Sequence, residues 1–341
     1  LHSMKYISSK NISWLACLLL VACQTEEVSE SGDGNFLQVL SVNLENEGSS
    51  TKAVVSSIDK VNVYATHTAE SAPSAGSSEN SEIAAHALSV FSYEGSSWGC
   101  ETPPELADAP YNIYAYYPLK RTDGTTLTAK NSSDGKHYIE IVVNSENFFS
   151  TQNQDDYLYA DQSAPVTASK SDKAISFTMK HALAKVSFEI TKDASASETL
   201  TLTKVEIVSR TGYLLTGQQG KMYLNNGKLT ALSSGELITL KGSVVLKNSL
   251  PSPNVSSLVA PIDAPEKALL FRLTVSVGGI ERVFETSTVK NDQVANWAGV
   301  QWQAGLEYIY QIKVSKMGGT ISGVTVHDWK KDSDQNTQVG I

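Results

Sequence analysis

Short segments in which apolar and polar residues alternate recur along the chain from residue 36 to its end. An alternation with period two buries one face of a strand and leaves the other face in water. Valine, isoleucine, threonine and aromatic residues, which strands favour, dominate these segments. The pattern predicts strands at residues 36–43, 61–64, 139–142, 186–190, 200–208, 271–277 and 308–314. Since no long stripe with helical spacing competes with them, we expect an all-β protein.

Glycine-rich turn signals separate several of these segments. The clearest is Gly278-Gly279, which stands between two alternating runs at residues 275–284 and predicts a β-hairpin. Many short strands at such spacing are typical of β-sandwiches and barrels. Open sandwiches leave unpaired strand edges, which other chains can pair with.

The length of 341 residues suits two domains. A polar stretch at residues 161–172 contains a proline and shows no periodicity. It predicts a boundary between a first β-sandwich at residues 53–170 and a second at residues 171–341.

The beginning of the chain has the composition of a bacterial lipoprotein signal. Lys5 and Lys10 precede a short apolar run that ends in Leu-Val-Ala directly before Cys23. Small residues suit the peptidase at the cut, and the cysteine thiol carries the lipid. We therefore expect a signal peptide at residues 1–23 and lipidation of Cys23. The alternative is an ordinary secretory signal that happens to end in cysteine.

Composition narrows the classes of partner. The net charge of −9 disfavours nucleic acid, because phosphate binding needs a basic face. Residues 24–34 are polar and acidic, which is typical of a tether. The cysteines are Cys17, Cys23 and Cys100. Since the first leaves with the signal and the second carries lipid, no disulfide is expected.

A search for catalytic chemistry finds none. The metalloprotease, nucleophile-elbow and P-loop motifs are absent from the sequence. The histidines stand apart from one another, and no calcium loop follows Asp155-Asp156, which we interpret as a solvated turn. Tryptophans that could stack on sugars are more often core residues in a β-sandwich; they are Trp98, Trp297 and Trp302. We expect no enzyme activity, no cofactor and no metal site.

Lys52 is the only basic residue between Gln24 and Asp59, and it follows a Gly/Ser loop that proteases could reach. A protease of trypsin-like specificity that cuts between Lys52 and Ala53 would release the strand predicted at residues 36–43. The alternative is an ordinary loop lysine, which the residues alone favour.

Several aromatic and apolar segments, taken in order, are similar to those of the fimbrillin family of Bacteroidales. They accompany the signal that ends at Cys23 and the loop at residues 51–53, and they lie at residues 111–118, 156–160, 175–186, 304–312 and 328–329. The resemblance spans nearly the whole chain. It implies a type V pilin or pilus-associated adhesin subunit that is made as a lipoprotein precursor.

The resemblance also implies a fold and a mode of assembly. The fold is two transthyretin-like Greek-key β-sandwich domains. A protease, usually arginine-specific, cuts a loop after the first strand, and the loss of that strand opens an apolar groove. A strand from the next subunit, commonly its C-terminal segment, then fills the groove. This chain departs from the family at the cut, where Lys52 stands in place of the usual arginine.

On this resemblance, residues 24–52 are an acidic tether with a removable first strand. Its apolar residues are Phe36, Leu37, Val39, Leu40 and Val42. A candidate donor strand lies at residues 320–326, with apolar residues Ile321, Val324 and Val326. The equal alternative for this last strand is that it simply completes its own domain.

The function predicted is that of a structural subunit of a cell-surface fimbria, assembled by proteolysis-triggered strand exchange and contributing to adhesion. The expected partners are other pilin subunits, outer-membrane lipid through Cys23, the processing protease and a host or bacterial surface receptor. The alternative is a monomeric surface lipoprotein that binds glycan.

Overall fold

The computed structural model describes residues 34–45, 58–67, 88–132, 136–151, 154–249, 251, 255–265, 267–288, 299–315 and 318–328. Within these ranges the chain forms strands, turns and loops and no α-helix, so the predicted all-β class is confirmed. None of the described residues belongs to a helix that is long and apolar enough to cross a membrane.

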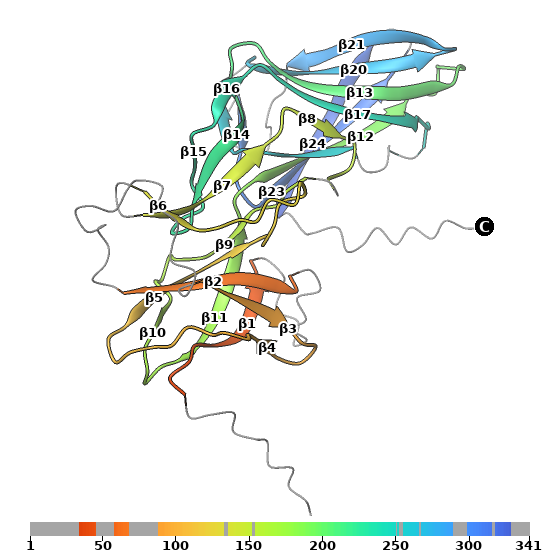
Figure 1. Cartoon of the computed structure of the whole chain (residues 1–341). Coiled ribbons are helices and arrows are strands. Elements are labelled where there is room, and N and C mark those ends of the chain that lie inside the picture. The colour runs from red at the N-terminus through yellow and green to blue at the C-terminus, as the bar shows by residue number, and fades with distance from the viewer. Residues whose placement is uncertain are drawn as a thin grey trace, which may run out of the picture. The chain divides into compact units, whose positions relative to one another are not determined.

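The first sheet has eight strands. Seven of them precede residue 170 and one follows it. Its order is β1-β11-β9-β5-β2-β3-β4, and β10 pairs with β5. The strands are β1 (Gln38–Leu44), β2 (Lys60–His67), β3 (Leu88–Tyr93), β4 (Trp98–Gly99), β5 (Tyr111–Tyr117), β9 (Leu158–Ala160), β10 (Thr167–Ala168) and β11 (Ala174–His181). β1 and β4 are the end strands, and Figure 1 shows β1 alongside β11.

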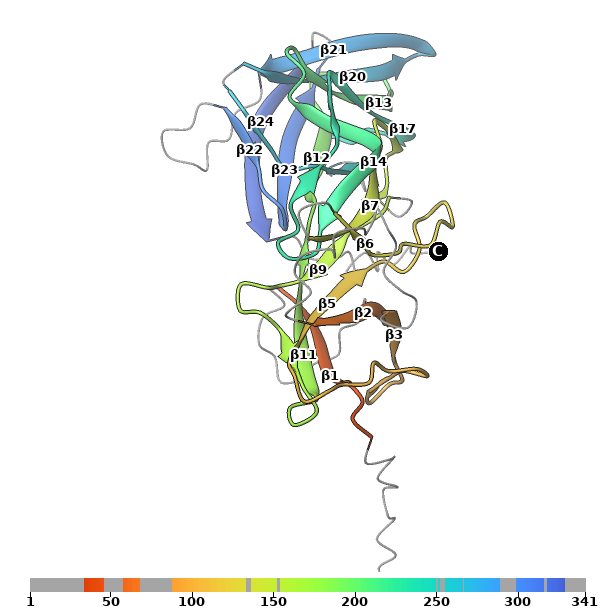
Figure 2. The same cartoon turned by 60° about the vertical axis from the view of Figure 1, so that its left-hand side comes forward.

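Two further sheets carry the second large core. A four-stranded sheet has the order β18-β12-β23-β24, and a five-stranded sheet has the order β21-β20-β13-β17-β8. Their strands are β8 (Glu146–Phe148), β12 (Ala184–Lys192), β13 (Leu200–Ser209), β17 (Leu237–Val245), β18 (Ser256–Val259), β20 (Leu269–Val277), β21 (Ile280–Thr288), β23 (Leu306–Val314) and β24 (Gly319–Asp328). β23 and β24 are the last two described strands of the chain, and they lie side by side in Figure 2.

The remaining strands form a five-stranded and a two-stranded sheet. The former has the order β15-β14-β7-β6 with β16 paired to β14, and the latter joins β19 to β22. The strands are β6 (Lys130–Asn131), β7 (His137–Val143), β14 (Leu214–Tyr223), β15 (Leu229–Thr230), β16 (Ser233–Gly235), β19 (Ile262–Ala264) and β22 (Val300–Trp302).

The hairpin predicted around Gly278-Gly279 is confirmed. Val277 of β20 pairs with Ile280 of β21, so the loop has two residues. Both glycines have positive φ, at 59° and 84°. Positive φ at both central residues matches the twist of the flanking strands, and glycine adopts it without steric cost.

The strand pairings cross the predicted boundary at residues 170/171. β11 pairs with β1 and β9 in the first sheet, whereas β12 pairs with β18 and β23. The chain therefore passes from one sheet to the next at residues 182–183. Two strands that precede the predicted boundary also pair with strands that follow it: β7 pairs with β14, and β8 pairs with β17. The described residues from Asn35 onward belong to one compact unit. The division into two transthyretin-like domains stays a prediction.

Each half of the described chain has its own core. The core beside the first sheet combines buried residues of β1, β2, β5 and β11. The larger core, between the four-stranded and five-stranded sheets, centres on three rings: Phe188, Phe271 and Tyr310. The ring of Phe271 meets the other two edge-on, with centroids 4.9 and 4.7 Å away. A third cluster of buried residues includes Ile139 and Ile141 of β7.

Candidate functional site

β1 occupies an edge of the first sheet. Its ladder partner is β11, and the two strands run parallel from Gln38↔Ala174 to Leu44↔Met179. At the far end of the sheet order stands β4, which also has one ladder partner. β1 is thus held by main-chain bonds along one side, which is the arrangement that makes an edge strand exchangeable.

A β-bulge in β1 decides which of its side chains face the core. Val39 pairs with Ile175 and Ser41 with Ser176, so Leu40 is an extra residue in the ladder. An extra residue shifts the alternation by one position. The inward-facing residues therefore lie at intervals of two, three and two positions, and all are buried: Leu37, Val39, Val42 and Leu44.

The bulge divides the residues predicted for the removable strand into two groups. Leu37, Val39 and Val42 are buried. Phe36 and Leu40 are 44% and 64% exposed, so they add little to the core area that the loss of this strand would expose. Leu44 is 4% exposed and was missed. The three-residue interval between Val42 and Val39 was the signal in the sequence, because strict alternation cannot place both on one face.

Contacts fasten both ends of β1. Before the strand, the amide of Leu37 donates to the carbonyl of Pro104 at 2.9 Å. After it, the amide of Glu45 donates to the carbonyl of Met179 at 2.8 Å. The Glu45 carboxylate also lies 2.9 Å from Lys180 Nζ, and this hydrogen bond raises the pKa of Lys180. The ion pair is partly exposed, so its contribution to stability is small.

The other side of β1 faces a narrow groove. Its lining comes from β1 and from the β3–β4 hairpin, namely Leu40, Ser41, Val42, Asn43, Tyr93, Ser96 and Trp98. The rings of Tyr93 and Trp98 lie 5.7 Å apart at its wall. The other edge of β1 therefore has side chains beside it, and no described strand pairs with it there.

β24 is the edge strand of the four-stranded sheet and pairs with β23 in antiparallel register. Its apolar side chains are partly buried against the larger core, namely Ile321, Val324 and Val326. In this single chain the candidate donor strand lies in its own sheet, and its donation to another copy stays a prediction.

β24 carries a bulge of its own. Gly323 pairs with Gln311 and Ile321 pairs with Ile312, so Ser322 is the extra residue. The Ser322 hydroxyl donates to the carbonyl of Gln311 at 3.2 Å. The inward-facing positions of β24 are Gly319, Ile321, Val324 and Val326, which again lie at intervals of two, three and two. β1 and β24 therefore share one spacing, with the extra residue at the same place.

Three predicted site residues lie outside the described residues. They are Cys23, Lys52 and Ala53. Lipidation and proteolytic processing at these positions stay predictions.

Two further candidates for chemistry prove to be packed side chains, and a third, Trp297, lies outside the described residues. Trp302 is 1% exposed and its indole N–H donates to Tyr310 Oη at 2.9 Å, so it is a core residue. Asp156 does not lie in a solvated turn, because its Oδ1 is 3.0 Å from Nδ1 of the buried His181. No group of three metal-ligating side chains occurs among the residues that the structure describes.

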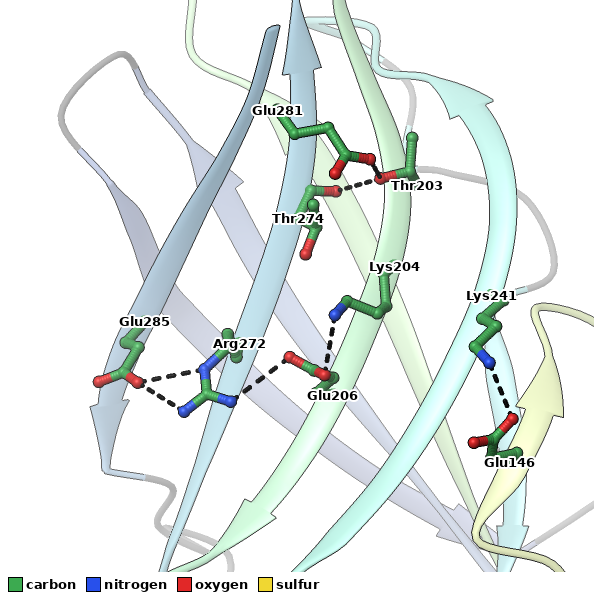
Figure 3. Close-up of polar contacts among 9 residues, drawn as sticks. All are labelled: Glu146, Thr203, Lys204, Glu206, Lys241, Arg272, Thr274, Glu281 and Glu285. Atoms are coloured by element: carbon green, nitrogen blue, oxygen red, sulfur yellow. Dashed lines mark hydrogen bonds and ion pairs between the residues drawn. The ribbon is translucent and has the colours of Figure 1, made fainter.

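The outer face of the five-stranded sheet carries a row of paired charges (Figure 3). Arg272 lies 3.0 Å from Glu285 and 3.5 Å from Glu206, and Lys204 lies 2.9 Å from Glu206. Lys241 of β17 lies 2.8 Å from Glu146 of β8. Since opposite charges alternate across neighbouring strands, they stabilise the sheet rather than concentrate one sign of charge for a ligand.

The geometry defines an all-β protein whose first and last described strands are both sheet edges. A family model described as fimbrillin-like matches residues 50–329. The chain therefore belongs to the fimbrillin-like family, as the resemblance predicted.

Solved structures from Bacteroides share the fold at low sequence identity. A candidate cell adhesion protein from Bacteroides uniformis is 19% identical with a TM-score of 0.52, covering 88% of this chain and 100% of that one. One from Bacteroides ovatus is 16% identical with a TM-score of 0.55, covering 88% and 99%. A fimbrial protein from Bacteroides vulgatus is 11% identical with a TM-score of 0.56, covering 86% and 99%. No curated protein matches the chain significantly.

Proposed function

We propose that this protein is a structural subunit of a cell-surface fimbria that assembles by strand exchange. Membership of the fimbrillin-like family supports the class, and the descriptions of similar structures as adhesion and fimbrial proteins agree with it. The observation that carries the mechanism is the shared spacing of β1 and β24, each with one bulge.

The proposal assigns a residue-level register to the exchange. With the bulges superposed, Ser322 takes the place of Leu40. Ile321, Val324 and Val326 then take the places of Val39, Val42 and Leu44. Gly319 falls at the place of Leu37 and brings no side chain. The donor from one copy would therefore run parallel to β11 of the next copy and fill three of the four inward positions.

Removal of β1 would destabilise the rest of the protein, because apolar area that β1 covers would meet water. Its four buried side chains contribute about 1.5–3 kcal/mol each, or roughly 6–12 kcal/mol in all, as an upper value. This approaches the whole stability of a typical domain, which is about 5–15 kcal/mol. A cut subunit would thus gain strongly from any strand that restores both the ladder and the core.

The donor loses less when it leaves its own sheet. Ile321, Val324 and Val326 are only partly buried there, whereas the β1 residues that they would replace are almost fully buried. Moving these side chains from a partly buried to a fully buried position is favourable in itself. The contact is head to tail, so repetition gives an open filament rather than a closed ring.

Processing would couple export to assembly. In this proposal the precursor is an outer-membrane lipoprotein held at the cell surface through Cys23. A protease of trypsin-like specificity cuts after Lys52, so that the mature chain begins at Ala53 and β1 departs with the tether. The polymer then contributes to adhesion through a surface receptor.

The test is limited proteolysis followed by assembly. Trypsin treatment of the folded precursor should yield a chain with Ala53 at its N-terminus, and this chain should form ladders of oligomers. The variant Val324→Asp places a charge at an inward position and should abolish the ladders. The matched variant Thr325→Asp changes the exposed neighbour and should keep them.

Three outcomes would contradict the proposal. One is a cut chain that stays monomeric although β1 has left. Another is a chain that polymerises equally well with Val324→Asp. The third is that oligomers form although β1 stays bound beside β11 after the cut, because the place of β1 would then not be where the incoming strand binds.

A further inference from the structure

We propose a mechanical function for the parallel ladder between β12 and β23: it carries tension along the fibre in shear. The direction of the tension rests on the proposed strand exchange, because the exchange decides where neighbouring subunits pull. The ladder itself is a feature of the single chain.

Force from one neighbour would enter through β11, beside which the incoming strand would lie. β11 continues into β12 with only Ala182 and Leu183 between them, and both are buried. The pull on β11 therefore reaches the N-terminal end of β12 through covalent bonds.

Force from the other neighbour would enter at the opposite end of the sheet. A donated β24 leaves its subunit through residues 315–318, which follow the C-terminal end of β23. β12 and β23 run parallel, from Lys185↔Glu307 to Lys192↔Val314. β12 is therefore pulled at the end where the ladder starts, and β23 is pulled at the end where it finishes.

Opposite pulls at opposite ends make two strands slide along each other. In that geometry the hydrogen bonds of the ladder are strained together and must break nearly at once. Strands pulled at the same end separate like a zipper, and one bond after another breaks under the same force. The ladder between β12 and β23 is loaded in this shear geometry, and its evenly spaced hydrogen bonds would share the strain.

Side chains strengthen the same pair of strands. Lys185 Nζ lies 3.4 Å from Glu307, and the Ser187 hydroxyl donates to the same carboxylate. Further along, the Gln311 amide donates to Glu189 at 3.0 Å. β23 keeps β12 as its neighbour after β24 leaves, because β12 lies on its other side. The pairing of β12 with β23 would therefore persist in the assembled fibre.

The place beside β11 that the donor strand would fill has the same geometry. In the proposed register the donor runs parallel to β11, as β1 does. The donor is pulled at its N-terminal end and β11 at its C-terminal end, where it joins β12. Both non-covalent steps along the fibre would therefore be loaded in shear.

The test is single-molecule force spectroscopy on the intact, uncut protein. Azide-bearing residues at Ala174 and Ser315 serve as attachment points for the shear geometry. Attachment at Ala194 and Ser315 gives the zipper geometry, because Asp193 and Val314 are hydrogen-bonded at one end of the ladder. We expect the shear geometry to rupture at several times the force of the zipper geometry.

A reversible staple identifies the ladder responsible. Glu189 and Gln311 are paired residues, so Glu189→Cys with Gln311→Cys can form a disulfide across β12 and β23. When the disulfide is formed, the high-force event should disappear, and reduction should restore it. Equal forces in both geometries, or an event that the staple leaves unchanged, would overturn the inference. Since no cut and no partner are involved, a failure of strand exchange would not affect this result.

Discussion

Leu40 shows how one residue arranges the face of a strand. It is 64% exposed and has no partner in the β11 ladder, yet it lets Val39 and Val42 both point inward. Without the bulge, an odd interval would turn one of them to solvent. The same holds for Ser322 in β24.

Deletion of Leu40 should therefore be tolerated. The remaining sequence alternates strictly, and the residues on both sides keep their partners in β11. We expect the free energy of unfolding to change by less than about 1 kcal/mol, since little buried area is lost. Deletion of Asn43 is the matched control, because it turns Leu44 outward and should cost about 2–3 kcal/mol. Urea denaturation measures both, and equal costs would contradict the bulge as the cause.

His137 is a partly buried histidine whose surroundings make stability depend on pH. Its ring lies edge-on to Tyr64 and Tyr114, with centroids 5.4 and 5.3 Å away. The described residues offer no hydrogen-bond partner to its Nδ1. Burial lowers the pKa of His137 to about 4, because a charged imidazole would lose its hydration there.

The pH dependence of stability follows from this pKa. In the unfolded chain a histidine takes up a proton near pH 6.5, whereas folded His137 does so only near pH 4. The contribution is therefore complete above pH 6.5 and is lost as the pH falls to 4, by about 3 kcal/mol in total. Urea unfolding at several pH values should show this fall, and His137→Phe should remove it. The idea fails if the variant keeps the same pH slope between 6.5 and 4.

At the scale of elements, local pattern predicted the strands but not their partners. Residues 200–208 and 271–277 alternate, and they form β13 and β20 with their apolar residues inward, as expected. The partner of β1 could not be predicted, because β11 lies far along the chain and no local signal points to it. The same is true of β8, whose three residues are too short to carry a pattern.

The candidate site was predictable in outline. Both edge strands were located from their apolar residues, and each proved to lie at the end of a sheet. The bulges were not predicted, because residues 36–42 are strongly apolar but alternate imperfectly, which leaves the inward face undecided. Only the pairing with a neighbouring strand decides it.

At the scale of the whole molecule, the segment after β7 ties the two halves of the described chain together. β8 pairs with β17, and the amide of Ser256 donates to the carbonyl of Phe149 at 2.7 Å. The Gln154 side chain accepts from the amide of Leu258 at 2.8 Å. Phe149 is buried in the larger core. It precedes the predicted boundary at residues 170/171, whereas the other buried residues of this core follow that boundary.

Gly242 is the position that admits Phe149. A Cβ at Gly242 would lie 2.2 Å from the phenyl ring, which must then move out of the core. We expect Gly242→Ala to lower the free energy of unfolding by about 1–3 kcal/mol, as overpacking does. Gly235→Ala is the control, because a Cβ there meets nothing nearer than 3.4 Å. Thermal or urea unfolding would refute the role of this contact if the two variants were equally stable.

The parallel pairing of β1 with β11 also orders the events of folding. Gln38 meets Ala174, which lies 136 residues further along the chain. Closing so long a loop is slow, and β1 can dock only after β11 has been made and has joined its other neighbours. The first of the described strands is therefore among the last to join its sheet. A newly made chain would briefly lack β1 beside β11, and its own β1 would fill that place before a strand of another copy does, because it is covalently attached to β11.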